Sequence, residues 1–442
     1  MAILFVLLAL VVLAVLAGAN WYLWRRLFRD TTRAPGWVRR GGAVLIAGGW
    51  ALAVSALVAE RTGAPFWLQR VLAWPGFLWL ALSIYLLLAV LAGEAVRPLL
   101  RRWLERRAPA DVPVARPVDA RHEETETVPS SARPGAKPAP PEGPPTTGSA
   151  PQDIGSVPQD TGSTLLAAPS RRLFVSRVVG GAAAVAAVGT VGYGTYGVLR
   201  GPRVKRVTVP LARLPRAAHG YRIAVVSDIH LSPVLGRGFA QKVVDTINGT
   251  QPDLIAVVGD LVDGSVKDLG PAAAPLAQLT ARHGSYFVTG NHEYFSGAEQ
   301  WVEEVRRLGL LPLENARTEL PWFDLAGVND IAGESEGQGP DFTKALGGRD
   351  TARACVLLAH QPVQIHDAVE HGVDLQLSGH THGGQLWPGS LLAAAANPTV
   401  AGLERYGDTQ LYVSRGAGAW GPPTRVGAPS DITVIELASK QT

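Results

Sequence analysis

The stretch YRIAVVSDIH, residues 221–230, places a continuous apolar run directly before an aspartate and a histidine. Five similar runs follow, each ending in a polar or glycine-rich turn: DLIAVVGD (253–260), SYFVTGN (285–291), ACVLLAH (354–360), DLQLSGH (374–380) and LYVSRG (411–416). Helix-like stretches lie between several of them: FAQKVVDTIN (239–248), PLAQLTAR (275–282) and EQWVEEVRRLG (299–309). Continuous apolar strands that alternate with amphipathic helices are typical of sheets covered by helices. Residues 201–442 are therefore predicted to form a layered α/β domain.

Carboxylate, imidazole and amide side chains recur where the predicted strands end. In chain order they are Asp228 and His230; Asp260 and Asp263; Asn291, His292 and Glu293; His360; and His380 and His382. Ligands of open α/β sheets gather beyond the carboxyl ends of the strands. Carboxylates and neutral imidazoles suit Mn, Fe and Zn alike, and a pair of cations needs a bridging ligand, usually a carboxylate. The pattern favours a two-metal centre. The glycines before Asp260, Asn291 and His380 allow the backbone to come close to the metals.

The ordered set DxH, GDxxD, GNHE, a lone histidine and GHxH, within residues 228–382, resembles the calcineurin-like metallophosphoesterase superfamily. The fuller GHTHGGQ (379–385) and SRGAGAWGPPTR (414–425) resemble its membrane-associated branch, which carries an N-terminal anchor or a twin-arginine signal. The resemblance covers about residues 205–438. It implies a metallophosphoesterase-type β-sandwich flanked by helices, with four layers in the order α/β/β/α.

The resemblance also implies a role for each strand-end residue. The ligands are Asp228, His230 and His382 for the first metal, Asn291, His360 and His380 for the second, and Asp260 as the bridge. His292 is not a ligand and donates a proton or a hydrogen bond to the phosphoryl or leaving-group oxygen. Asp263 either orients a ligand from behind or caps its loop. A bridging hydroxide, whose pKa two cations lower, then attacks phosphorus in line.

Other residues near the motifs fall outside the predicted ligand set. Glu293 is expected to be structural, and Cys355 to be a small buried side chain. His366 and His371, in VQIHDAVEHG (363–372), are five apart and do not share a helix face well, so both are expected at the surface. Trp387 and Trp420 line the substrate, face a membrane or simply pack. Gln385 has no assigned role.

Four uncharged apolar runs precede the α/β domain, and each approaches the roughly 20 residues that a membrane-spanning helix needs. They extend to Trp24, from Arg40 to Glu60, from Arg70 to Glu94, and from Arg177 to Arg200. A cleaved signal peptide is the alternative for the first. The fourth is mostly Gly, Ala and Val and follows SRRLFV (170–175), which looks like a twin-arginine export signal acting here as an internal anchor.

These runs divide the chain into four parts. Residues 1–105 form a membrane region with three transmembrane helices, 106–170 a linker, 171–200 the fourth transmembrane helix, and 201–442 the catalytic domain. The linker is crowded with Pro, Gly, Ser, Thr and Ala, repeats PQDIGS (151–156) as PQDTGS (158–163), and is expected to be disordered because it has too few large apolar residues to form a core.

Arginine placement predicts the orientation. The loop after the first run and RRWLERR (101–107) are rich in arginine, so both are expected in the cytoplasm. The fourth helix then carries the catalytic domain out of the cytoplasm, and the protein is a multi-pass protein of the cell membrane. Arg200, Arg203, Lys205 and Arg206, directly after that helix, argue for the opposite side.

Charge and cysteine content exclude some classes. Lysine plus arginine outnumber aspartate plus glutamate by only 41 to 37, and the catalytic part has no basic stripe or aromatic platform, so no nucleic-acid partner is expected. A single cysteine excludes an intramolecular disulfide.

The expected function is that of a bacterial, membrane-anchored phosphoesterase that uses two divalent ions, such as manganese. Its expected substrate is a phosphodiester of a lipid or a cell-envelope polymer, with membrane lipids as partners. The alternative is a non-catalytic scaffold or sensor.

Overall fold

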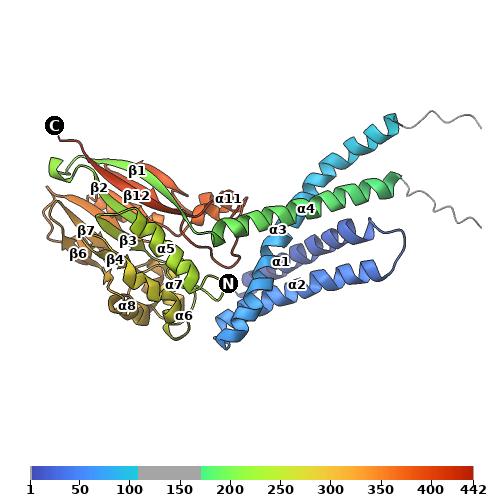
Figure 1. The fold of residues 1–442 in the computed structure, drawn as a ribbon, viewed down its shortest axis with the longest axis horizontal. Helices are drawn as coiled ribbons and strands as arrows, with labels where there is room; N and C mark the ends of the chain where they lie inside the picture. The colour runs from blue at the N-terminus through green and yellow to red at the C-terminus, as the bar shows by residue number, and fades with distance from the viewer. Residues whose placement is uncertain (1, 108–170, 442) are drawn as a thin grey trace, which may run out of the picture.

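The computed structural model describes residues 2–107 and 171–441 of the 442-residue chain. Figure 1 shows a bundle of long helices beside a compact α/β domain. The bundle consists of α1 (Ala2–Trp24), α2 (Trp37–Arg61), α3 (Phe66–Arg106) and α4 (Arg171–Leu199). The linker predicted at 106–170, with its two PQD repeats, lies outside the described residues except for Arg106 and Arg107, where α3 ends.

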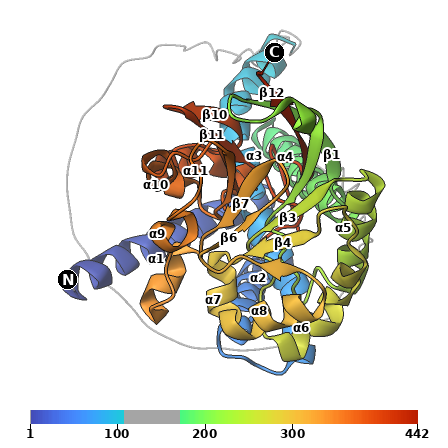
Figure 2. The same ribbon diagram turned by 90° about the vertical axis from the view of Figure 1, so that its left-hand side faces the viewer.

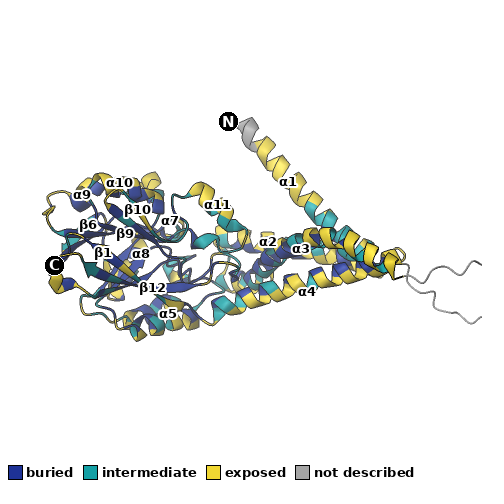
Figure 3. Cartoon of the chain, turned by 90° about the horizontal axis from the view of Figure 1, so that it is seen from above, coloured by how far each residue is buried: buried dark blue, intermediate teal, exposed yellow. Residues whose placement is uncertain are grey.

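All four bundle helices are long and apolar enough to cross a membrane. Along α1 and the outer face of α4, large apolar side chains are exposed (Figure 3), as expected for surfaces that face lipid. The third helix extends beyond the apolar run predicted from Arg70 to Glu94 and contains 41 residues. The charged residues that follow the run are good helix formers, so the helix continues beyond its apolar part.

Small residues let the bundle helices approach one another. Gly49 of α2 lies against the ring of Trp79 of α3, and Gly76 of α3 lies against the backbone of Leu52. A Cβ atom at either glycine would overlap its neighbour, and such close small-residue contacts are typical of helix packing in membranes. A further cluster joins α1, α3 and α4 through Leu23, Ala81, Tyr85, Val90, Ala187 and Val191.

Charged residues gather at one end of the bundle. Arg26 forms ion pairs with Asp30 (3.1 Å) and with Glu94 of α3 (2.8 Å). At the same end, Arg177 Nε of α4 donates to the carbonyl of Thr31 at 3.0 Å. Because α4 starts there and ends on the α/β domain, the arginine-rich end and the α/β domain lie at opposite ends of the bundle (Figure 1).

Two six-stranded sheets form the α/β domain. The first has the order β1-β12-β2-β3-β4-β5, and the second β10-β11-β9-β8-β7-β6. The strands of the first sheet are β1 (Arg203–Leu211), β2 (Tyr221–Val226), β3 (Leu254–Val258), β4 (Ser285–Val288), β5 (Leu311–Pro312) and β12 (Asp431–Ser439). Those of the second are β6 (Ala316–Glu319), β7 (Phe323–Gly327), β8 (Ala354–Leu358), β9 (Leu375–Ser378), β10 (Gly402–Tyr406) and β11 (Thr409–Val413).

Helices cover the outer face of each sheet. The first sheet packs on α5 (Arg237–Gly249), α6 (Val266–Ala273) and α8 (Ala298–Arg307), and the second on α9 (Phe342–Leu346) and α10 (Ile365–Glu370). A core between the sheets joins side chains such as Val225 and Val258 to Leu358 and Tyr412. Seen from the domain end, the layers follow one another as helix, sheet, sheet and helix (Figure 2). The predicted four-layer fold is therefore confirmed.

The helix predicted at 275–282 is wrong. A short 3₁₀ turn, η3 (Ala274–Gln278), is present, and the chain is extended from Leu279. Asn248 of α5 accounts for the difference, because its side chain accepts from Thr280 N (3.0 Å) and donates to Gln278 O (2.7 Å). These are backbone groups that a continued helix would use, so the neighbouring helix ends the turn.

Candidate metal centre

The predicted ligands converge at one edge of the two sheets. Strands β2, β3 and β4 run parallel, as do β8 and β9, so their carboxyl ends point the same way. Asp228 and His230 follow β2, Asp260 follows β3, His360 follows β8, and His380 and His382 follow β9. Asn291 opens the short helix α7 (Asn291–Ser296) after β4. Both sheets therefore contribute to one site.

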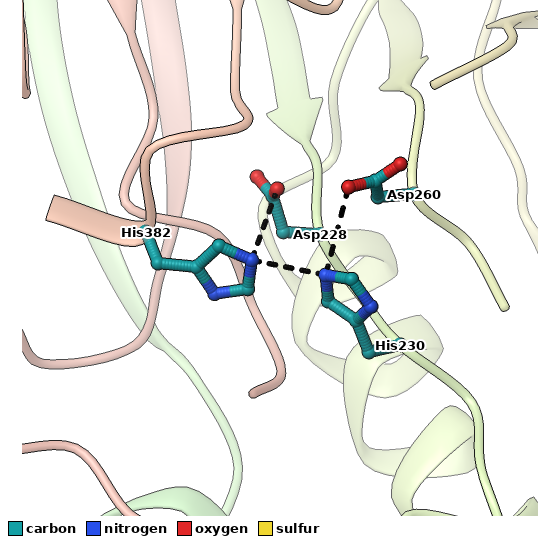
Figure 4. A group of neighbouring side chains, drawn as sticks. All are labelled: Asp228, His230, Asp260 and His382. Atoms are coloured by element: carbon teal, nitrogen blue, oxygen red, sulfur yellow. Dashed lines mark hydrogen bonds and ion pairs between the residues drawn. The ribbon is translucent and has the colours of Figure 1, made fainter. Parts of the chain in front are cut away.

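Asp228, His230, Asp260 and His382 form a first group whose candidate ligand atoms lie within 4.8 Å of one another. His230 Nε2 lies 2.9 Å from His382 Nε2 and 3.7 Å from Asp260 Oδ2. His382 Nε2 lies 3.4 Å from Asp228 Oδ1. Figure 4 shows the four side chains pointing toward a common centre. They are the three residues expected at the first metal and the expected bridge.

A second group shares Asp260 with the first and adds His360 and His380. His360 Nε2 lies 3.1 Å from the same Oδ2 of Asp260 that faces His230. His380 Nδ1 lies 3.0 Å from Asn291 Oδ1. The structure thus brings together all seven predicted ligands, with one carboxylate oxygen between the two groups.

Hydrogen bonds behind the rings indicate whether this site fits cations. His360 Nδ1 donates to Val258 O (2.9 Å), which leaves a lone pair on Nε2 facing the Asp260 carboxylate. His360 Nε2 is buried and has no hydrogen-bond partner in the described part of the chain. His230 Nδ1 likewise donates to Asp263 Oδ1 (2.9 Å), which frees its Nε2. Lone pairs aimed at one another and at carboxylates fit divalent cations placed between them.

Protons compete with metal for these lone pairs. Burial opposes a charge on His360, yet the adjacent Asp260 carboxylate raises the pKa of this imidazole well above its usual value. Burial would also raise the pKa of Asp260, but His360 holds it well below the usual range. Because a cation must displace the proton that this raised pKa favours on His360, metal affinity is expected to fall as the pH falls.

Arg425 contacts His382 in a way that sequence reasoning missed. Its guanidinium Nη2 lies 3.0 Å from His382 Nδ1. Arg425 also donates to the carbonyls of His382 (3.0 Å) and Gly418 (2.6 Å). Burial, together with the charges of His230 and Arg425, lowers the pKa of His382 well below its usual value. The buried arginine thus fixes the ring and disfavours its protonated form.

Asp263 holds two histidines at once. Its Oδ1 lies 2.9 Å from His230 Nδ1 and 2.7 Å from His292 Nδ1. Burial would raise the pKa of Asp263, but the two histidines lower it to about 2. Burial opposes a charge on His292, while the hydrogen bond to Asp263 raises its pKa to about 9. The hydrogen bond to Asp263 therefore favours the protonated form of His292, and the same carboxylate lies behind the ring of His230.

Glu293 is fully buried and accepts three backbone hydrogen bonds. The donors are Gly290 N (2.6 Å), Leu261 N (2.8 Å) and Asp260 N (2.9 Å). Its carboxylate thereby ties the loop after β3 to the start of α7, which supports the structural role expected from the sequence.

Replacing Glu293 by glutamine is expected to lower stability. The amide nitrogen can only donate, so it faces a backbone N–H and leaves at least one buried donor unsatisfied, costing on the order of 1–3 kcal/mol. Chemical denaturation of the purified protein, measured with metal present, checks this. Glu299→Gln, at an exposed site of α8, is the matched control and should change little. Equal stability of the two variants would contradict the role given to Glu293.

The backbone at the site is strained. Five of the seven predicted ligands are non-glycine residues with left-handed φ: Asp228 (51°), His230 (46°), Asp260 (52°), His380 (71°) and His382 (52°). Such conformations cost free energy and cluster at functional sites. A Cβ atom on Gly290 would overlap Asp260 Oδ1, and one on Gly379 would overlap Asp228 Oδ2. The close approach expected of these glycines is therefore present.

Gln385 now has a structural explanation. Its Nε2 donates to the carbonyls of Trp420 (2.9 Å) and Pro422 (3.1 Å), and its Oε1 accepts from Trp420 N (3.0 Å). The last residue of GHTHGGQ is thus hydrogen-bonded to the segment 414–425, which carries Trp420 and Arg425. The indole of Trp420 lies 5.6 Å from the ring of His292, and half of this residue is exposed.

The remaining candidates lie away from the metal groups. His366 is exposed, and the ring of His371 lies 5.5 Å from that of Phe342 on the outside of the second sheet. Cys355 is buried and free, as expected.

Comparison with known proteins agrees with this geometry. Residues 221–384 match the family model for the calcineurin-like phosphoesterases. A zebrafish transmembrane protein with a metallophosphoesterase domain is 40% identical over 260 residues, which are 55% of this chain and 59% of that protein. Uncharacterised metallophosphoesterases of Helicobacter pylori and Aquifex aeolicus are 37% and 33% identical, over 62% and 54% of this chain and 74% and 92% of their own.

The double sheet and the family match place the chain in the class of metallophosphoesterases. With relatives that match over most of their length, the chain belongs to the calcineurin-like metallophosphoesterase family. The chain spans 59% of the length of the zebrafish relative.

Proposed function

We propose that the protein is a membrane-anchored phosphoesterase that uses two divalent cations. The observation that carries this proposal is the convergence of two ligand groups on one carboxylate oxygen of Asp260. We assign Asp228, His230 and His382 to one metal and Asn291, His360 and His380 to the other. Manganese, iron and zinc all suit these ligands.

Bound cations would supply an activated hydroxide and neutralise charge on the phosphoryl group. The protein's own residues would do the rest. His292, protonated and hydrogen-bonded to Asp263, would give its proton to the leaving oxygen. Asp263 would hold His292 and His230 in register, and Arg425 would hold the loop that carries His382. The product alcohol then leaves neutral, and the histidine regains its proton from water.

We propose a phosphodiester in a lipid head group or a cell-envelope polymer as the substrate. The position of the site supports this, because α2 ends beside it: the guanidinium of Arg61 lies 5.7 Å from the ring centre of Phe295, in α7. Phe295 is exposed, and its ring lies 5.4 Å from that of His292. The proton donor therefore lies close to the end of a membrane helix.

We also propose the division into a three-helix membrane region (1–105), a linker (106–170), a fourth membrane helix (171–200) and a catalytic domain (201–442). The arginine-rich end of the bundle would face the cytoplasm, which would put the catalytic domain on the extracytoplasmic side of the cell membrane. The opposite placement of the two ends supports this orientation. Protease protection in sealed inside-out and right-side-out vesicles tests it, since the catalytic domain should be cleaved only in the latter.

Activity is tested with the full chain in nanodiscs. The protein is stripped of metal with a chelator and then reloaded separately with Mn²⁺, Fe²⁺ or Zn²⁺. Hydrolysis of bis-p-nitrophenyl phosphate should disappear on stripping and return on reloading. A panel of a monoester, a diester and a lipid-linked pyrophosphate then identifies the bond that is cleaved. Two bound metals without turnover of any substrate would favour the scaffold or sensor function instead.

A further inference from the structure

Helix α11 (Gly389–Ala396) is the feature of the α/β domain that the function above leaves unexplained. Its sequence is GSLLAAAA, and none of its described residues is buried. Leu391 is 69% exposed and Leu392 is 77% exposed. A helix of a water-soluble domain normally turns its apolar residues toward a core, whereas α11 turns them outward.

The sequence around α11 is uncharged over a long stretch. From Gly383 to Leu403 the chain contains no Asp, Glu, Lys, Arg or His. The stretch starts directly after the predicted metal ligand His382 and includes Trp387, which is 54% exposed. The exposed leucines of α11 are therefore neither buried in the domain nor surrounded by charged residues that would favour contact with water.

The stretch is attached to the bundle helices. Tyr85 Oη of α3 donates to the carbonyl of Trp387 at 3.0 Å. The neighbouring Leu386 packs against the cluster that joins α3 and α4. Tyr85 belongs to the third apolar run, so Trp387 contacts the apolar part of α3. Figure 3 shows α11 next to the bundle, with its surface exposed.

A second attachment fixes the same edge of the domain. Phe66, the first residue of α3, packs against the core under the first sheet, and Val234 packs against Ala56 and Phe77 of the bundle. Val234 lies four residues after the predicted metal ligand His230. The α/β domain therefore meets the bundle at several places, and the metal groups lie along the edge that faces it.

We propose that α11, with Trp387, inserts into the interfacial layer of the bilayer and is covered there by lipid. The argument for lipid as the occupant is continuity: α11 extends the apolar surface of helices that themselves cross the bilayer, and it has the leucines and the tryptophan that interfacial helices use. The segment that enters the membrane directly follows the predicted ligand His382. Its insertion therefore holds the metal centre at the membrane surface. Insertion itself does not depend on catalysis, whereas a role in presenting lipid phosphoesters to the centre rests on the proposed function.

The test uses the full chain in nanodiscs. Cys355→Ala removes the native thiol, and Leu392→Cys introduces one label position for the environment-sensitive dye NBD. Asp408→Cys, whose side chain is fully exposed at the far side of the domain, is the matched control. Emission of the label at 392 should shift to the blue and be quenched by lipids that carry a doxyl group near the head group. The label at 408 should be quenched by aqueous iodide and not by these lipids.

Two results would overturn the proposal. If iodide quenches position 392 as strongly as position 408, α11 lies in water. If neither lipid nor iodide quenches position 392, protein covers α11, as a second copy of the chain would. Leu391→Cys repeats the measurement one residue away, and the unfolding temperature of each labelled variant checks that the fold is kept. A failure of catalysis would leave these readings intact, so the two proposals fail separately.

Discussion

Replacing Asp260 by asparagine is expected to remove nearly all turnover and at least one metal ion per chain. Oδ2 of Asp260 faces His230 and His360, and the neutral amide cannot bridge two cations as a carboxylate does. Loss of a group that merely supports a ligand typically costs 10–100-fold in affinity or activity, so loss of the bridge should cost at least about 100-fold. Metal analysis and hydrolysis of bis-p-nitrophenyl phosphate measure the two effects.

The fold should survive this change. Asparagine has nearly the same shape, and Glu293 binds the backbone N–H of residue 260 and not its side chain. Circular dichroism before and after the substitution verifies this. Asp408→Asn, at a fully exposed carboxylate of the same domain, controls for a general effect of charge. Wild-type turnover in Asp260→Asn would exclude the proposed bridge, and with it the two-metal site.

Replacing His292 by asparagine is expected to slow turnover while leaving metal content unchanged. Proton donation by a positioned side chain contributes about 10²–10⁴-fold, and the effect should be largest for leaving groups that need a proton. The loss should therefore be large on an alkyl phosphodiester and small on bis-p-nitrophenyl phosphate, whose leaving group departs readily as an anion. His366→Asn, at an exposed histidine, is the control.

The pH dependence gives this prediction a second readout. A general acid works while it is protonated, so activity should decline as the pH rises through the pKa of His292, which the hydrogen bond to Asp263 raises to about 9 despite burial. Bound cations repel this charge, so the decline should come no later than about pH 9. The His292→Asn variant should lack this decline. Loss of metal, or an equal loss on both leaving groups, would contradict the assignment of His292.

Much of the fold could be predicted because the central strands are continuous apolar runs. Strands β2, β3, β4, β8 and β9 lie where such runs were found, since both faces of each strand are buried. The edge strand β1, RVKRVTVPL, was not predicted, because it is partly exposed and alternates charged with apolar residues. Burial on two faces is visible in a sequence, whereas pairing at an edge depends on a distant partner, here β12.

The candidate ligands could be predicted because each follows its strand directly, so strand order alone gathers them. Arg425 lies 43 residues from His382 in a segment without regular structure, and nothing local in PPTR indicates that its guanidinium is buried. Asn248 ended the helix predicted at 275–282 for a similar reason, since its contacts with Gln278 and Thr280 cross between elements. Contacts that depend on tertiary placement were the ones that sequence reasoning missed.

The position of β12 has a consequence for the order in which the domain can be assembled. The last strand of the chain lies between β1 and β2, which are the first two strands of the domain. While the ribosome is still synthesising residues 431–439, β1 has no neighbour to pair with in the first sheet. The first sheet must therefore stay incompletely paired until residues 431–439 have been synthesised. Removing the second half of β12 should be far more damaging than its distance from the metal centre suggests.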